Sequence, residues 1–304
     1  MKTKILVVLM CAACVISLPV FAGGKSETAD TSLAKIKEKG NFVLGLDDSF
    51  PPMGFRDDSG NIVGFDIDLA KEAAKRMGVD VVLKPVDWDG VLLSLKKGDI
   101  DVIWNGLTIT ESRKEQIAFS KPYLENRQII VVKGDSSIQK KADLAGKTVG
   151  LQMGSSSEEA LASDATTASS LKEVRKYSNN VEALLDLAAG RIDAVVVDEI
   201  VGRYYIAKKP GEYKVLSENF GTESYGVGIR KEDVSFRTEL DRVLDEMKKD
   251  GMAKDHMAKD EMKKDPMAKD SMAKDGMKKD AMIKELPAEE RPREKLIHYG
   301  PESL

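Results

Sequence analysis

The sequence predicts an α/β protein built of two similar halves, each a sheet covered by helices. Two observations predict this: short apolar runs alternate with segments of helical periodicity, and the alternation recurs after residue 147. The chain of 304 residues is also long enough for two domains of ordinary size, each with its own core. Strands that alternate with helices favour parallel sheets with both faces covered.

The elements of the first half follow in order along the chain. A strand is predicted over 41–46, followed by a loop that Pro51 and Pro52 prevent from continuing as sheet. Apolar residues at helical spacing then run up to Met77 and stop at Gly78, a typical C-cap. Further on the pattern predicts a strand over 79–86, a helix with its apolar face at Val91, Leu92 and Leu95 that ends at Gly98, and a strand over 100–104.

The second half repeats this order. It predicts a strand over 147–152, a helix opened by Ser155 or Ser156 with Glu158 or Glu159 in the capping-box position, a helix over 181–189 and a strand over 192–197. A returning strand is predicted over 225–230. The apolar stripe of a closing helix follows, formed by Phe236, Leu240, Val243, Leu244 and Met247.

The N-terminus predicts export. Two lysines precede an apolar run over 5–20, and small residues stand before Gly23, so residues 1–22 are interpreted as a signal peptide. Cleavage there removes Cys11 and Cys14 and leaves a chain without thiols. The run is shorter than the ~20 residues that span a bilayer. Because Ala12-Ala13-Cys14 resembles the end of a lipobox, a lipid anchor through Cys14 stays open.

Residues 251–304 are predicted to form a repeat tail with an irregular end. Methionine recurs at every fifth position from Met247 to Met282, mostly within Met-Ala/Lys-Lys-Asp units. Five residues advance a helix by ~140°, so successive methionines do not share a face and a coiled coil is excluded. We interpret the tail as solvated. Copper capture by the thioethers is the alternative, which the wide spacing disfavours.

Charge and composition exclude several classes of function. Lys and Arg number 47 against 51 Asp and Glu, a net charge of −4, which argues against nucleic-acid binding. Both histidines, His256 and His298, lie in the tail, and no serine stands in a nucleophile elbow. Nucleophilic and zinc chemistry therefore lack their residues, and we expect no cofactor and no metal site.

Three charged residues stand at strand ends or beside them: Asp47, Arg113 and Asp198. A guanidinium offers a planar bidentate fork to a carboxylate, and a carboxylate at the carboxyl end of a strand can pair with an ammonium group. Brought together, they could hold a free amino acid. This pattern favours a binding protein over a catalyst.

Ordered motifs over residues 33–251 carry a family resemblance. They include GFDIDLA (64–70), GLTITESR (106–113), IAFS (117–120), LAGKTVG (144–150), GSSS (154–157) and GRIDA (190–194). With these motifs the chain resembles the polar amino-acid-binding proteins of ABC uptake systems, the bacterial extracellular solute-binding proteins of family 3. The resemblance implies the type II periplasmic-binding-protein-like fold, with two lobes joined by a two-strand hinge. It places lobe 1 at 33–127 and 222–250 and lobe 2 at 128–221.

The resemblance also implies a set of ligand-binding residues. Arg113 would hold the ligand carboxylate and Asp198 its ammonium, while Ser155 and Ser156 complete the carboxylate cage unless they serve as plain N-caps. The ligand side chain would lie between Phe50 and Trp88, and its distal end would reach Asp47 and Asn105. Gly106 and Thr108 would supply two further polar contacts. Core packing is the competing role for Phe50 and Trp88, and we assign Phe65 and Phe119 to the core.

Together these interpretations predict a periplasmic, exported or lipid-anchored receptor. It would bind a polar or basic L-amino acid as a monomer, close its two lobes on it, and deliver it to the membrane permease of an ABC transporter. Two alternatives stay open. Cyclohexadienyl dehydratases share this fold, and an assay on prephenate or arogenate would detect that activity. A surface protein that binds a macromolecule through the tail would lose its binding when the tail is deleted.

Overall fold

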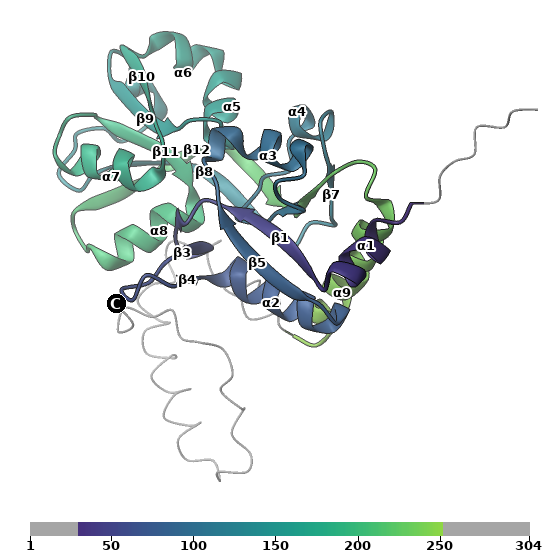
Figure 1. The fold of residues 1–304 in the computed structure, drawn as a ribbon. Helices are drawn as coiled ribbons and strands as arrows, with labels where there is room; N and C mark the ends of the chain where they lie inside the picture. The colour runs from purple at the N-terminus through teal and green to yellow at the C-terminus, as the bar shows by residue number, and fades with distance from the viewer. Residues whose placement is uncertain (1–29, 252–304) are drawn as a thin grey trace, which may run out of the picture.

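The structure is a computed structural model that describes residues 30–251. It contains two five-stranded sheets in two separate lobes, each flanked by helices (Figure 1). We call the part around the first sheet lobe 1 and the part around the second lobe 2. This confirms the predicted two-lobed α/β architecture. The predicted signal peptide and lipobox, and the repeat tail beyond Gly251, lie outside the described residues.

The sheet of lobe 1 has the strand order β5-β1-β6-β13-β7. Its strands are β1 (Asn41–Leu46), β5 (Asp80–Pro85), β6 (Val102–Ile103), β7 (Ala118–Phe119) and β13 (Gly228–Ile229). β1 pairs in parallel with β5 and β6, whereas β13 is antiparallel to β6 and β7. The prediction of a purely parallel sheet is wrong here, because β13 belongs to the segment that returns from the other lobe.

The sheet of lobe 2 has the order β10-β9-β11-β8-β12. Its strands are β8 (Leu124–Lys133), β9 (Thr148–Gln152), β10 (Glu173–Tyr177), β11 (Ala194–Asp198) and β12 (Tyr213–Tyr225). β9, β10 and β11 run in parallel, and β8 pairs antiparallel with both β11 and β12. Every residue of β9 and of β11 is buried, as expected for strands covered on both faces.

Helices cover both sheets. Lobe 1 carries α1 (Ser32–Lys39), α2 (Phe65–Met77), η1 (Trp88–Gly90), α3 (Val91–Lys97), α4 (Glu111–Lys114) and α9 (Val234–Lys249). Lobe 2 carries η2 (Lys141–Leu144), α5 (Ser156–Ser163), α6 (Ala165–Ser170), α7 (Asn180–Ala188) and α8 (Glu199–Lys208). α2 ends as predicted at Gly78, whose φ of 72° is readily adopted by glycine.

The closing helix α9 packs on lobe 1 through the predicted apolar stripe. Phe236, Leu240, Val243 and Met247 are buried and Leu244 is partly buried. The ring of Phe236 lies 5.7 Å from that of Phe42 in β1, centroid to centroid. This contact ties the last described helix to the first strand of the sheet.

Two segments carry the chain between the lobes. β8 and the end of β12 pair antiparallel, with Leu124 opposite Tyr225, and Tyr225 also forms a bridge with Thr108 of lobe 1. The lobe boundaries implied by the resemblance, between 127 and 128 and between 221 and 222, fall within these two strands. The residue boundaries of the lobes stay a prediction.

Several elements differ from the sequence-based expectation. The segment after β1 is not a plain loop, because β2 (Ser49–Phe50), β3 (Gly54–Arg56) and β4 (Ile62–Val63) form a small antiparallel sheet. The two prolines fit there because they stand in the turn between β2 and β3, where no ladder hydrogen bond is needed. The strand predicted over 100–104 is shorter, β6 alone.

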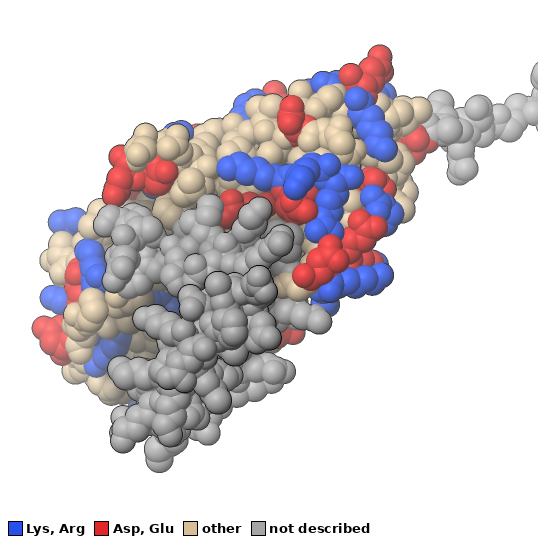
Figure 2. All heavy atoms as spheres, turned by 90° about the horizontal axis from the view of Figure 1, so that it is seen from below, with Lys and Arg blue, Asp and Glu red and all other residues tan. Residues whose placement is uncertain are grey.

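Figure 2 shows basic and acidic side chains interleaved on one face of the molecule. Several ion pairs are formed within residues 30–251, among them Arg242 with Glu239 and Glu246, and Arg76 with Glu72 and Asp250. Within residues 30–251, no helix combines the length and the apolar character needed to cross a membrane.

Candidate functional site

A small cavity lies between the two lobes. It is lined by Phe50, Trp88, Gly106 and Arg113 from lobe 1 and by Gln152, Ser155, Ser156 and Asp198 from lobe 2. Seven of these eight residues belong to the predicted site, and Gln152 is the addition. The cavity volume is about 10 Å³, which is too little for more than one water molecule. Any larger ligand therefore requires the lining to separate.

Arg113 supplies the positive charge of the cavity. It stands in the short helix α4, where the Thr110 side chain accepts a hydrogen bond from its backbone N–H at 3.3 Å. Its guanidinium donates to the Thr108 carbonyl at 2.9 Å and to the Gly154 carbonyl of lobe 2 at 3.1 Å. Among residues 30–251, no carboxylate forms an ion pair with it, although Asp198 is near enough to act on its charge. Burial lowers the pKa of Arg113, but a guanidinium stays charged.

Asp198 supplies the negative charge from the carboxyl end of β11. It is buried, and its Oδ1 accepts from Asn126 Nδ2 at 2.5 Å, Gln128 Nε2 at 3.0 Å and the Tyr225 hydroxyl at 2.7 Å. Burial and the nearby Glu223 raise the pKa of Asp198 well above its ordinary value. A cation beside this carboxyl would relieve both effects, so the position suits an ammonium group.

Glu223 is a site residue that the sequence analysis missed. It lies on β12, and its Oε1 accepts from Thr108 Oγ1 at 2.8 Å, Asn126 Nδ2 at 2.7 Å and Gln128 Nε2 at 2.8 Å. Thr108 also contacts Ser156 Oγ at 2.9 Å across the lobes. The signal that points to Glu223 is its position in the second crossover segment, which brings it to the same place as Asp198.

The hydroxyl of Ser155 does not cap helix α5, contrary to the prediction. Ser155 is the N-cap residue of α5, yet its Oγ donates backwards to the Gln152 carbonyl at 2.7 Å. Glu158 Oε2 accepts from the Gly154 backbone N–H at 3.0 Å instead of forming the predicted capping box with the N-cap residue. The side-chain capping prediction is therefore wrong. The start of α5 still presents its free backbone N–H groups where the cavity lies.

The predicted aromatic walls, Phe50 and Trp88, line the cavity and also belong to hydrophobic clusters: Phe50 to one that spans both lobes and Trp88 to one within lobe 1. Both roles proposed for them are thus compatible. Gly106, at φ 60°, lies against Phe50: a Cβ there would stand 2.7 Å from Phe50 Cε1. Of the two aromatic residues assigned to the core, Phe65 is buried and Phe119 is partly buried.

Asp47 and Asn105 lie at the edge of the cavity and do not line it. Asn105 Oδ1 accepts from the Asp47 backbone N–H at 3.1 Å, and Asp47 Oδ2 accepts from Gln152 Nε2 at 2.7 Å. Asn105 Nδ2 is buried and finds no partner among residues 30–251. A free donor and an anionic oxygen thus stand where the distal end of a ligand was expected.

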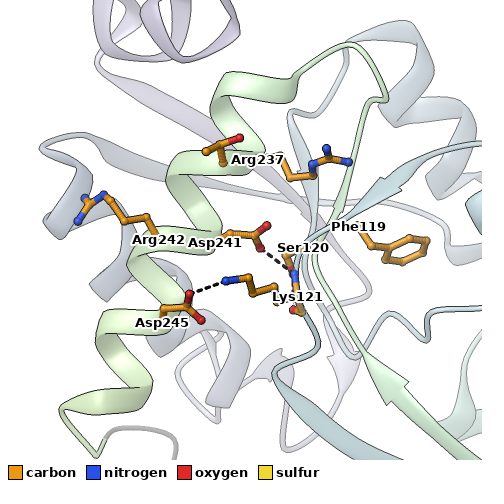
Figure 3. Close-up of a pocket in the computed structure, with 8 residues that line it drawn as sticks. Phe119, Ser120, Lys121, Arg237, Asp241, Arg242 and Asp245 are labelled. Atoms are coloured by element: carbon orange, nitrogen blue, oxygen red, sulfur yellow. Dashed lines mark hydrogen bonds and ion pairs between the residues drawn. The ribbon is translucent and has the colours of Figure 1, made fainter.

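A larger groove of about 550 Å³ lies elsewhere, on the outside of lobe 1 between α9 and the segment after β7 (Figure 3). It is open to solvent and contains none of the predicted site residues. Within it, Asp241 accepts from the Lys121 backbone N–H at 2.7 Å and Asp245 pairs with Lys121 Nζ at 2.5 Å. Because Lys121 and Asp245 already pair with each other, their charges are less available to a ligand than those of the small cavity between the lobes.

Comparison with known proteins identifies the family. A family model of bacterial extracellular solute-binding proteins, family 3, matches residues 42–259. The chain belongs to this family. The resemblance inferred from the motifs is thereby confirmed. Family 3 members are extracellular or periplasmic solute-binding proteins.

Individual family 3 relatives are amino-acid-binding proteins. The L-cystine-binding protein TcyJ of Escherichia coli is 36% identical over 229 residues, covering 75% of this chain and 85% of the relative. The lysine/arginine/ornithine-binding periplasmic protein of Escherichia coli is 36% identical over 233 residues, covering 74% and 88%. Both are named as binding proteins rather than enzymes.

Solved structures agree with the fold. An ABC uptake transporter substrate-binding protein from Streptococcus pneumoniae with bound histidine superposes with a TM-score of 0.71 at 35% identity, covering 74% of this chain and 93% of that one. An ancestral arginine-binding protein bound to arginine superposes with a TM-score of 0.67 at 44% identity, covering 72% and 97%. The type II periplasmic-binding-protein-like fold expected for family 3 is confirmed.

Proposed function

We propose that the protein is the exported receptor of an ABC amino-acid import system and binds a polar or basic L-amino acid between lobes that close on it. One observation carries this proposal: Arg113 and Asp198 line the same buried cavity and lack an ion-pair partner among the described residues. A free amino acid brings a carboxylate and an ammonium, the two groups that complement them. Within this proposal Phe50 and Trp88 contact the side chain, and Gly106, Thr108, Ser155 and Ser156 complete the polar contacts.

The relatives support a polar or basic ligand. The relatives described above are named for cystine, for lysine, arginine and ornithine, and for bound histidine or arginine. Asp47 and the free Asn105 Nδ2 at the cavity edge fit a ligand whose distal end is cationic or polar. The receptor would act as a monomer without a cofactor and without enzymatic activity, in the periplasm or anchored through Cys14, and would deliver its ligand to a membrane permease.

A thermal-shift panel tests the proposal. The mature protein is heated with each of the twenty common amino acids, with ornithine and with cystine, and hits are titrated by calorimetry. A ligand that binds the folded state alone raises the melting temperature by mass action, and a micromolar Kd corresponds to about 8 kcal/mol. We expect at least one polar or basic L-amino acid to bind. Turnover of prephenate or arogenate without amino-acid binding would favour the dehydratase alternative.

A further inference from the structure

Two carboxyl groups from different strands lie together beside the cavity: Asp198 of β11 and Glu223 of β12. They share the same two amide donors. Asn126 Nδ2 donates to Asp198 Oδ1 at 2.5 Å and to Glu223 Oε1 at 2.7 Å. Gln128 Nε2 donates to the same two oxygens at 3.0 and 2.8 Å. The shared donors hold the two acids against each other.

The surroundings of the pair supply little compensating charge. Among residues 30–251, neither acid forms an ion pair with a Lys, Arg or His. The titratable and charged groups around them are Arg113 of α4, Glu159 of α5, Tyr225 of β12, Tyr123 before β8, and Glu199 of α8, which is neutralised by Arg127 and Arg203. The phenols stay neutral, because burial raises the pKa of Tyr225 and of Tyr123 well above its ordinary value. Among the described residues around the pair, Arg113 is thus the one arginine that forms no ion pair with another acid.

Two adjacent acids with one nearby cation cannot both ionise without cost. Burial of Asp198 removes the water that would screen this repulsion, which favours the protonated form of Asp198. We propose that Glu223 is a second acidic residue of the cation subsite and that Asp198, held against it, carries a proton which the ammonium group of the ligand displaces. The displaced proton goes to the solvent. This inference rests on the proposed function, because it takes the ligand to be a free amino acid.

The pair would also select ligands. An ammonium group interacts more strongly with two ionised acids than with a singly protonated pair, so its binding is linked to loss of the proton. An amino acid whose α-nitrogen is acylated has no α-ammonium group to replace that proton in this subsite. We therefore expect L-arginine to bind with proton release and N-acetyl-L-arginine to bind at least a hundredfold more weakly.

The first arm of the test needs no ligand. Infrared spectra of the full mature chain at about pH 6 are compared for the parent, Glu223→Gln, Asp198→Asn and Glu125→Gln. Glu125 is exposed on β8 and faces Ser224 in the β8–β12 ladder, so it controls for loss of a charge near the crossover. We expect the carboxylic-acid absorption to fall in the first two variants and to persist in the control. Asp66 adds to that absorption in all four proteins, so the measured quantity is the difference in absorption between each variant and the parent.

The second arm is calorimetry with L-arginine in two buffers of different ionisation enthalpy, which counts the protons released on binding. We expect the release in the parent to fall at least by half in Glu223→Gln and to be unchanged in Glu125→Gln. Arginine binding with the same release in Glu223→Gln would overturn the inference and leave the proposed function standing. An infrared difference without binding of any amino acid in the panel would support the carboxyl pair and refute the proposed function.

Discussion

Gln152 Nε2 in lobe 2 donates a 2.7 Å hydrogen bond to Asp47 Oδ2 in lobe 1. The second oxygen of Asp47 is already occupied by Ser49, whose backbone N–H and hydroxyl donate to it at 2.9 and 2.5 Å. Because Gln152 lines the cavity, this bond closes the cavity edge and leaves the charge of Asp47 one side chain away from it. A cationic group of a ligand could take the place of the Gln152 amide at that oxygen.

Asp47→Asn therefore tests the preference for basic ligands. We expect its affinity for L-arginine to fall by about 1.5–3 kcal/mol, the usual value for a hydrogen bond to a charged group, and its affinity for L-glutamine to change much less. Titration calorimetry of both amino acids measures the difference. Asp48→Asn is the matched control, since Asp48 instead pairs with Arg56 outside the cavity. An equal loss for both amino acids would assign Asp47 to lobe closure rather than to ligand charge.

Removing either charge of the cavity should weaken binding strongly. Arg113→Ala or Asp198→Ala leaves a desolvated ligand charge without a partner, so we expect each to lose about 2–5 kcal/mol of binding free energy. Asp193→Ala should behave differently, because its Oδ2 accepts from the Thr148 backbone N–H at 2.8 Å and so holds β9. It should lower the melting temperature before it lowers affinity. Parent-like binding by Asp198→Ala would refute the ammonium assignment.

The size of the cavity predicts a hinge motion. At about 10 Å³ it cannot admit an amino acid unless the lobes part, and the two crossover segments β8 and β12 are where the backbone can bend. We expect the ligand-free protein in solution to populate an open form and added ligand to reduce the radius of gyration. Small-angle scattering with and without saturating ligand measures this. Saturated binding with an unchanged radius would mean a preformed site.

Asp66 predicts a pH dependence of stability. Its Oδ2 accepts from the Gly106 backbone N–H at 2.6 Å and from the Tyr123 hydroxyl at 2.9 Å, and its Oδ1 finds no partner among residues 30–251. Burial raises the pKa of Asp66 from 3.8 to about 7. The folded state therefore binds more protons than the unfolded state above pH 4, so stability falls as pH rises through 7.

Asp66→Asn should remove this slope. Between pH 5 and pH 8 the parent is expected to lose about 2–3 kcal/mol more unfolding free energy than the variant, by linkage from the two pKa values. At pH 5 the difference between the two proteins should be smaller than at pH 8, because Asp66 is then neutral in the folded state and ionised in the unfolded state alone. Urea unfolding at both pH values gives the comparison. Parallel pH profiles would show that Asp66 is ionised in the native protein across this range.

Local patterns predicted much of the fold. The glycine stop at Gly78, the apolar stripe of α9 and the buried strand before Asp198 depend on neighbours in sequence, and the structure has all three. The resemblance added Arg113, which composition leaves indistinguishable from a surface arginine. Both kinds of signal can be recognised in the sequence because each lies within a short stretch of consecutive residues.

What escaped prediction depends on distant pairing. Glu223, Gln128 and Asn126 reach the site because β12 pairs with β8, and nothing in their local sequence distinguishes them from exposed polar residues. The prediction that Ser155 caps α5 through its side chain failed for a related reason. Its hydroxyl has two acceptable partners, and the carbonyl of Gln152 competes successfully with the helix N-terminus. Side-chain hydrogen bonds with several nearby alternatives are decided by packing, which sequence patterns do not show.

Truncation after Gly251 should leave ligand affinity within about twofold of that of the full chain, because every residue assigned to the site precedes Gly251 in the sequence. The residues that line the cavity lie between Phe50 and Asp198, and α9 is anchored by the packing of Phe236 on Phe42. The 2.7 Å ion pair of Arg76 with Asp250 is retained in the shortened chain. Calorimetry on both chains, with circular dichroism to verify folding, measures the effect.

A modest fall in melting temperature is compatible with this prediction, which concerns ligand affinity. The matched control is a full-length chain in which methionines 252–282 are replaced by alanine, which removes the thioethers and keeps the length. If the truncated chain lost amino-acid binding while its lobes stayed folded, the tail would be part of the receptor. Binding kept by the alanine variant would then assign that role to the charged residues of the repeat rather than to its methionines.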